Sequence, residues 1–310
     1  ISHLRDRATE LEILINEALF SSTRVVASTL VSSNHRILNG RRFSTLFIDE
    51  AAQALEAACW IAIRKADRVI FAGDHCQLPP TIKCIEAARG GLDHTLMEKV
   101  VANKPISVSL LKVQYRMNES IMRFPSEWFY NNQLESAPEI RQRGILDFDT
   151  PMIWIDTSEM ECHEEFVGES FGRINKPEAN LLLQELESYI QKIGENRVLD
   201  EQIDFGLISP YKAQVQYLRN KIKSSSFFRR FRPLITVNTV DGFQGQERDV
   251  IFISLVRANE SGQIGFLNDL RRMNVAITRA RMKLVILGNA TTLTKHTFYH
   301  KLMEYIQKQF

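Results

Sequence analysis

The sequence predicts an α/β protein whose parallel sheets are covered by helices on both faces. Short apolar runs rich in Val and Ile alternate with helical segments along the chain. Short buried strands separated by helices are typical of parallel sheets that have no wet face. The chain has 310 residues, of which 44% are hydrophobic and 25% are charged, which suits about two globular domains.

The first part of the chain is expected to begin with a charged amphipathic helix over residues 3–20. The apolar runs that follow are expected to be strands: VVASTL (25–30), TLFIDEA (45–51), RVIFAGD (68–74) and ISVSLL (106–111). Between them, ALEAACWIAIRKA (54–66) is expected to be helical. The order of elements therefore alternates from the start.

The same alternation resumes after about residue 112. The predicted strands are PMIWIDT (151–157), FGLISPY (205–211), LITVNTV (234–240), DVIFISLV (249–256) and KLVILGN (283–289). Helices are expected over 175–193, 211–223 and 269–281. Asn175 is a plausible cap of the first of these, because Pro177 suits an early helical position. Residues 131–150 and 223–233 are expected to be surface loops.

Composition excludes several classes of protein. A net charge of +2 and a pI of about 8.3 do not demand nucleic acid, although they permit a local basic groove. The four cysteines have no CxxC spacing and are expected to be reduced intracellular thiols. No apolar run reaches the roughly 18 residues of a membrane span. We therefore expect a soluble, intracellular, monomeric core with no membrane partner, and Ile1 in place of Met suggests a piece of a longer protein.

Polar residues collect where three predicted strands end. Asp49 and Glu50 follow LFI, Gly73 and Asp74 follow RVIFA, and the segment 241–247 follows LITVNTV. Ligands of parallel sheets bind at the carboxyl ends of strands. An Asp there can hold hydrated Mg²⁺, and an adjacent Glu can take a proton from water. The bland alternative is an acid pair at a helix N-terminus, and the chain contains no Gly-Lys dipeptide of a phosphate-binding loop.

Two further signals have ordinary interpretations. His75-Cys76 and Cys162-His163 offer metal ligands, but neither pair has a second spaced pair, so a metal site of this kind is not favoured. FFRRFRP (227–233) could stack nucleobases, although a solvated loop with a partly buried ring is the favoured interpretation.

Five segments resemble helicase motifs II to VI of superfamily 1, in the family's order. They are FIDEAAQ, FAGDHCQLPP, QYRMN, NTVDGFQGQERDVIFISLVR and NVAITRARMKLVILGN, and RVVASTL and GLISPYKAQV resemble motifs Ic and IVa. The subgroup that they resemble includes the nonsense-mediated-decay helicase, senataxin and the immunoglobulin-switch-region-binding helicase. The resemblance extends from about residue 24 to residue 308.

The resemblance implies two RecA-like domains that face each other across ATP, with single-stranded nucleic acid over both. Residues 1–111 would be the first domain, truncated at its N-terminus, and residues 112–310 would be the second. The phosphate loop (motif I) and an adenine-contacting glutamine lie upstream in the family and are missing from this chain. Without that loop, the acid pair cannot hold ATP well.

The resemblance also implies a role for each motif residue. In the catalytic set, Asp49 would hold Mg²⁺, Glu50 would activate water, Gln77 would read the γ-phosphate, and Arg116 and Arg279 would be arginine fingers. For the rest of the nucleotide, Tyr115 would stack near the base, and Gly245 and Glu247 would lie on the sugar side. Interdomain salt bridges are the ordinary alternative for the two arginines, turn capping is that for Gln77, and Arg281 is expected to form structural ion pairs.

Backbone-directed contacts with nucleic acid are expected from residues at strand ends. The resemblance places four residues there: Thr29, Pro210, Tyr211 and Thr239. Such contacts would not depend on base sequence, and DNA and RNA stay equally open.

The expected function is the C-terminal part of an ATP-dependent superfamily 1 helicase or translocase core, moving 5′ to 3′ on single strands by resemblance. The fragment alone is expected to be inactive. Two alternatives stay open: a degenerate helicase used as a non-hydrolysing nucleic-acid scaffold, and a P-loop ATPase that remodels protein. The four residues Glu50, Gln77, Arg116 and Arg279 argue against the scaffold.

Overall fold

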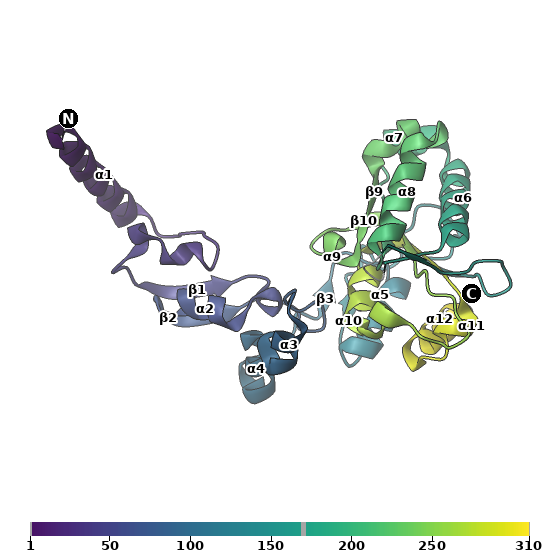
Figure 1. The fold of residues 1–310 in the computed structure, drawn as a ribbon, viewed down its shortest axis with the longest axis horizontal. Coiled ribbons are helices and arrows are strands. Elements are labelled where there is room, and N and C mark those ends of the chain that lie inside the picture. The colour runs from purple at the N-terminus through teal and green to yellow at the C-terminus, as the bar shows by residue number, and fades with distance from the viewer. Residues whose placement is uncertain (1, 169–171, 310) are drawn as a thin grey trace. The chain divides into compact units, whose positions relative to one another are not determined.

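The computed structural model describes residues 2–168 and 172–309. The chain divides into two compact units (Figure 1), which are described separately below. Unit 1 comprises Ile1–His75 and Pro79–Val108, and unit 2 comprises Cys76–Leu78 and Ser109–Phe310. No helix among the described residues has the length and apolar character needed to cross a membrane.

Unit 1 is built on a two-stranded parallel sheet with a small core around Ile48, Ala51 and Cys59. Its strands are β1 (Phe43–Ile48) and β2 (Ala66–Phe71), and its helices are α1 (Ser2–Ser22), α2 (Glu56–Ile63), α3 (Ile85–Ala87) and α4 (Leu96–Asn103). A π-helical turn spans Ala88–Leu92, and 3-10 turns span Ser32–Asn34, Arg36–Leu38, Ala51–Gln53 and Pro105–Ser107. The predicted helix 3–20 and the strands in TLFIDEA and RVIFAGD are therefore confirmed, while the helix predicted over 54–66 is shorter, as α2.

Two strand predictions before residue 112 are wrong. Residues 25–30 and 106–111 form no strand, and Val25, Ile106 and Leu111 are 83%, 98% and 87% exposed. A β-branched run becomes a strand only if another strand satisfies its backbone groups, and among the described residues β1 and β2 pair only with each other. Instead, Thr29 O accepts from Ser33 N at 3.0 Å and closes a turn.

Unit 2 contains a five-stranded, fully parallel sheet in the order β5-β11-β10-β8-β9. These strands are β5 (Met152–Asp156), β8 (Phe205–Ser209), β9 (Ile235–Thr239), β10 (Arg248–Ser254) and β11 (Ala280–Gly288). Two smaller pairs are β3 (Val113–Gln114) with β4 (Glu135–Ser136), and β6 (Glu165–Val167) with β7 (Gly172–Ile174). All five strands predicted after residue 112 are confirmed.

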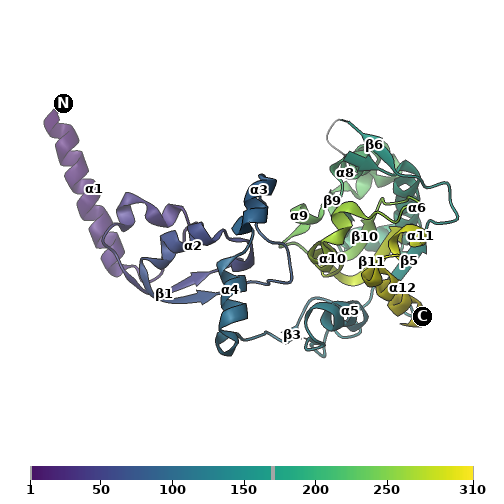
Figure 2. The same cartoon turned by 60° about the horizontal axis from the view of Figure 1, so that its bottom comes forward.

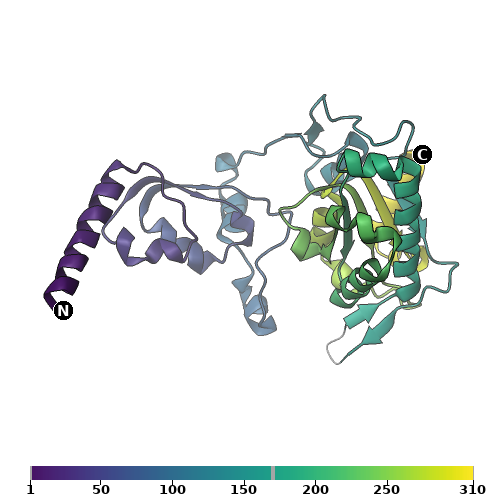
Figure 3. The same cartoon turned by 90° about the horizontal axis from the view of Figure 1, so that it is seen from above.

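Helices cover both faces of this sheet (Figures 2 and 3). Residues of α5 (Glu119–Phe129), α10 (Leu270–Ile277) and α12 (Thr297–Gln309) build the core on one face. Residues of α6 (Lys176–Ile193) and α8 (Lys212–Ser224) build the other. The remaining helices are α7 (Glu195–Asp200), α9 (Val240–Phe243) and α11 (Ala290–Leu293), and 3-10 turns span Phe227–Arg230, Arg232–Leu234 and Gly265–Asn268. The parallel, doubly covered sheet predicted from the sequence is confirmed.

Local signals in unit 2 explain where its elements begin. The Asn175 side chain accepts a hydrogen bond from Glu178 N at 3.1 Å, so Asn175 caps α6 as predicted. In the 223–233 segment, Phe228 and Phe231 are 3% and 0% exposed. Those two rings pack into the α6–α8 core and cannot stack bases, and their burial is more complete than the partly buried ring that the sequence favoured.

Candidate functional site

The acid pair of unit 1 lies where β1 ends. Asp49 and Glu50 are exposed, and Asp49 Oδ1 accepts from Glu50 N at 3.0 Å. Glu50 has a left-handed backbone with φ of 50°, and its Oε2 accepts from Gln53 Nε2 at 2.8 Å. Two exposed carboxylates at a strand end are the oxygen donors that a hydrated Mg²⁺ prefers, so these residues fit that ion.

The loop after β2 packs against the loop after β1. Ala51 N donates to Ala72 O at 2.9 Å. A Cβ on Gly73 would lie 3.0 Å from Ala51 N and 3.1 Å from Ala52 N, so the close approach requires glycine. This contact holds in place the turn that carries Asp49 and Glu50.

In unit 2 the segment 241–247 does not stay at the carboxyl edge that the sequence predicted for it. Glu247 immediately precedes β10 and Arg279 immediately precedes β11, and both strands run parallel to β8. Both residues therefore lie at the amino edge of the sheet, not beyond carboxyl ends. The expectation for 241–247 is wrong at this point because α9 and residues 244–247 carry the chain back from the end of β9 to the start of β10.

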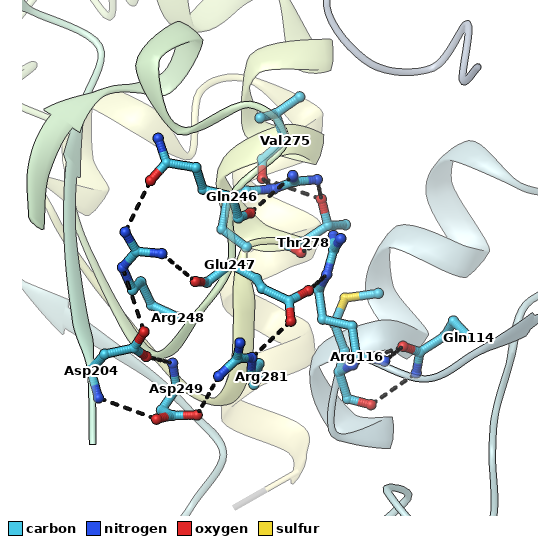
Figure 4. A network of polar contacts seen from close by, with 12 residues as sticks. Gln114, Arg116, Asp204, Gln246, Glu247, Arg248, Asp249, Val275, Thr278 and Arg281 are labelled. Atoms are coloured by element: carbon cyan, nitrogen blue, oxygen red, sulfur yellow. Dashed lines mark hydrogen bonds and ion pairs between the residues drawn. The ribbon is translucent and has the colours of Figure 1, made fainter. Parts of the chain in front are cut away.

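Glu247 is the centre of an ion-pair network at this edge (Figure 4). Its Oε2 accepts from Arg116 Nε, and its Oε1 accepts from Arg281 Nε at 2.9 Å. Arg281 Nη1 also donates to Asp249 Oδ1 at 3.1 Å, as expected for a structural arginine. Burial raises the pKa of Glu247, but the hydrogen bonds and charges of Arg116 and Arg281 outweigh burial and lower it overall. Glu247 is thus held as a carboxylate.

Protein contacts hold both the backbone and the guanidinium of Arg116. Gln114 Oε1 accepts from Arg116 N and Met117 N, at 2.8 and 2.7 Å, which fixes the loop backbone. Arg116 Nη1 donates to Thr278 O at 3.1 Å, and the side chain keeps 33% of its surface exposed. The guanidinium is therefore positioned by protein contacts while part of it can still meet a ligand.

Arg279 is much more enclosed, with 2% exposure. It lies past the end of α10, because the helix predicted over 269–281 ends at Ile277. Its guanidinium donates to Val275 O at 3.0 Å, Gln246 O at 3.1 Å and Thr278 Oγ1 at 3.0 Å. Nη2 also donates to Gln77 Oε1 at 3.4 Å, so Gln77 and Arg279 come together within unit 2.

Tyr115 is exposed, and Gly245 has a left-handed backbone. The Tyr115 ring is 67% exposed beside Arg116. Gly245 has a φ of 76°, a left-handed backbone that explains glycine at this position in FQGQE. The exposed Tyr115 ring and the open space around Gly245, where an added Cβ would meet no atom within 4 Å, leave room for a ligand, and both roles stay predictions.

The four residues that were expected to contact nucleic acid differ in position and exposure. Pro210 follows β8 and Thr239 ends β9, and Ser209 pairs with Thr239, so these two lie together at the carboxyl edge. Tyr211 is 4% exposed. Thr29 is exposed but follows no strand, so the expectation that it lies at a strand end is wrong.

The residues that hold the two arginines, Gln114 and Thr278, were missed at the sequence level. Thr278 contacts both guanidiniums, through its carbonyl and its hydroxyl. Gln114 lies in the motif QYRMN and Thr278 lies in AITRAR, so both residues could have been found from these motifs.

Two family models match successive parts of the chain, and the point after residue 84 where the first match ends does not coincide with the division into compact units. Two families described as "AAA domain" match residues 92–291 and residues 1–84. An uncharacterized ATP-dependent helicase of Methanocaldococcus jannaschii is 36% identical over 299 residues, which cover 95% of this chain and 43% of that protein. DNA-binding protein SMUBP-2 of Mesocricetus auratus is 34% identical over 307 residues, covering 95% and 30%.

Regulator of nonsense transcripts 1 homolog of Arabidopsis thaliana is 37% identical over 314 residues, covering 97% of this chain and 24% of that protein. Among solved structures, the PRRSV helicase matches 80% of this chain and 36% of its own, with a TM-score of 0.41 and 16% identity. The chain spans less than half the length of the curated relatives named here.

Proposed function

Because the chain belongs to the superfamily 1 helicases, in the subgroup that contains the nonsense-mediated-decay helicase and senataxin, we propose that it is part of an ATP-driven motor. The motor couples ATP hydrolysis to movement on single-stranded nucleic acid. The observation that carries this proposal is the grouping of Arg116, Glu247, Arg279 and Gln77 at one edge of unit 2.

Arginines and a glutamine in one place suit phosphoryl transfer. That reaction needs positioned groups that neutralise charge on the γ-phosphoryl oxygens, with little covalent chemistry by the protein. In this proposal Arg116 and Arg279 are the fingers, and Gln77 links the phosphate to Arg279. For Arg279, the role requires that phosphate oxygens replace some of its carbonyl acceptors, because the guanidinium is buried.

In unit 1, Asp49 holds Mg²⁺ and Glu50 takes the proton from the attacking water. Mg²⁺, when bound, neutralises phosphate charge. Both side chains are exposed at the end of β1, which supports this assignment. Tyr115, Gly245 and Glu247 are assigned to the base and sugar of the nucleotide.

The strand is proposed to contact the carboxyl edge of unit 2 through its phosphates. Pro210 and Thr239 lie there on neighbouring strands, and Thr29 is the proposed contact in unit 1. Contacts of this kind are independent of sequence. We propose single-stranded DNA or RNA as the partner, and a monomeric motor core that works inside the cell.

The chain alone is proposed to bind ATP weakly and to be inactive, because it contains no Gly-Lys dipeptide. Calorimetry on the 310-residue chain should detect no micromolar ATP binding. Helicase-like phosphate release by that chain would contradict the assignment.

The activity itself is tested with the protein expressed from its complete coding sequence. Phosphate release should rise on addition of single-stranded DNA or RNA, and a duplex with a single-stranded tail should be unwound. Strand binding without hydrolysis would instead support a scaffold, and hydrolysis that strands do not stimulate would support a protein-remodelling ATPase.

A further inference from the structure

Phe266 is an exposed aromatic residue close to the carboxyl edge of unit 2. Its side chain is 59% exposed and belongs to the 3-10 turn Gly265–Asn268, between β10 and α10. Single exposed apolar residues are common and need no explanation. The surroundings of Phe266 are what distinguish it.

The turn that carries Phe266 is anchored on both sides. Ile264 and Leu267 are 7% and 1% exposed and belong to the core between the sheet and α10–α12. Tyr299 Oη donates to Leu267 O at 2.8 Å. A ring between two buried neighbours cannot fold back into the core without displacing them.

Gly265 fixes the turn further. It has a φ of 56°, and a Cβ there would lie 2.4 Å from Arg257 Nη1 and 3.1 Å from Tyr211 Oη. The Arg257 guanidinium is itself buried and paired with Glu164 at 2.7 Å. The backbone before Phe266 therefore packs directly on a buried ion pair, which restricts the position of the ring.

Tyr211 supports the Phe266 ring from behind. The two ring centroids are 5.7 Å apart with an interplanar angle of 42°. Tyr211 is buried and directly follows Pro210, a proposed strand contact at the end of β8. The exposed ring is thus a fixed aromatic surface beside the proposed path of the strand.

We propose that Phe266 is a stacking site for one nucleobase of the bound strand. This inference rests on the proposed function. Every base has a π-face, so stacking adds affinity without choosing a sequence, and it complements phosphate contacts at the same edge. The ligand class is any unpaired purine or pyrimidine of a single strand.

The test uses the protein expressed from its complete coding sequence, with Phe266→Ala and Phe266→Trp. Phe266→Ala should weaken single-strand binding roughly 5- to 150-fold, the range expected for loss of one stacked base. Its salt dependence should not change, because no charge is removed. Phe148→Ala is the matched control, since Phe148 is exposed and precedes the amino end of β5 at the opposite edge.

Phe266→Trp supplies a spectroscopic readout. Its emission, taken as the difference from that of the wild-type protein, should be quenched by a normal strand and not by an abasic strand. Phe148→Trp should be quenched by neither. Wild-type affinity in Phe266→Ala, or equal quenching by abasic strands, would overturn the stacking site. A wild-type protein that binds no single strand would instead overturn the proposed function and remove the premise.

Discussion

Arg279 Nη2 donates to Gln77 Oε1 at 3.4 Å, although the two residues lie 202 positions apart in sequence. Both belong to unit 2, where the segment Cys76–Leu78 packs with the later part of the chain. Gln77 follows the strand-end segment that carries Gly73, and Arg279 precedes β11. The two side chains that we propose to contact the γ-phosphate are therefore in direct contact with each other.

Replacement of Arg279 by Lys should keep the charge and lose the fork of donors. In the protein expressed from its complete coding sequence, strand-stimulated hydrolysis should fall by roughly 10³–10⁵. The unfolding free energy should also drop by about 1–3 kcal/mol, because buried carbonyls lose donors. Phosphate release and chemical unfolding measure the two effects. A folded variant with normal hydrolysis would leave Arg279 a purely structural role.

The two acids of unit 1 should behave differently when neutralised. Asp49→Asn should raise the Mg²⁺ concentration needed for half-maximal hydrolysis, because one ligand oxygen loses its charge. Glu50→Gln should keep nucleotide binding and lose hydrolysis, because the proton acceptor is removed. Asp67→Asn, an exposed acid of β2 that pairs with Arg42, is the control and should change neither quantity. Equal effects of the first two variants would refute the division of roles.

Glu178 predicts a pH dependence of stability. Burial raises the pKa of Glu178 to about 7, although hydrogen bonds from Ser254 Oγ and Val256 N oppose that rise. The folded state then holds a proton that the unfolded state releases above its ordinary value of 4.5. The contribution of Glu178 to the unfolding free energy is therefore fully present below pH 4.5. It is lost as the pH rises toward about 7, by up to about 1.4 kcal/mol per pH unit.

Unfolding of the wild type and Glu178→Gln by urea should show this dependence as a difference. The wild type should lose stability relative to the variant across that window, and the difference should level off above it. Glu187→Gln, on the same helix, should track the wild type. A pH-independent difference between Glu178→Gln and the wild type would contradict burial as the cause.

Strand binding should be dominated by phosphates. The logarithm of affinity should fall linearly with the logarithm of salt concentration, and strands of different sequence should bind alike. Fluorescence anisotropy with homopolymer and mixed-sequence strands measures both. Tight, salt-insensitive and sequence-selective binding would mean that base edges are read.

The fold of unit 2 was predictable because its strands are apolar runs, and the three central strands β8, β10 and β11 are buried over most of their length. The same reasoning failed for 25–30 and 106–111, because propensity cannot reveal whether a partner strand is available. Strand formation there depends on the rest of a sheet and not on the segment itself.

In the candidate site, the helicase-like motifs pointed to Arg116, Glu247 and Arg279, but they did not predict how these residues are arranged in space. The edge at which Glu247 lies depends on strand direction and on where the chain returns after α9. The burial of Arg279 depends on carbonyls of Val275 and Gln246, which no side-chain pattern records. Contacts made by backbone atoms across the fold are the part that the sequence could not predict.

The central claim, that Arg116 acts on the nucleotide, is tested most directly against Arg281. Both arginines donate to Glu247, and their side chains are similarly exposed, at 33% and 30%. Steady-state phosphate release in the presence of single strands is measured for Arg116→Ala and Arg281→Ala in the protein expressed from its complete coding sequence, with thermal unfolding of each to check that it is folded. The account predicts a loss of roughly 10³-fold or more for Arg116→Ala and near-normal hydrolysis for Arg281→Ala. Equal losses in the two folded variants, or near-normal hydrolysis by Arg116→Ala, would contradict it.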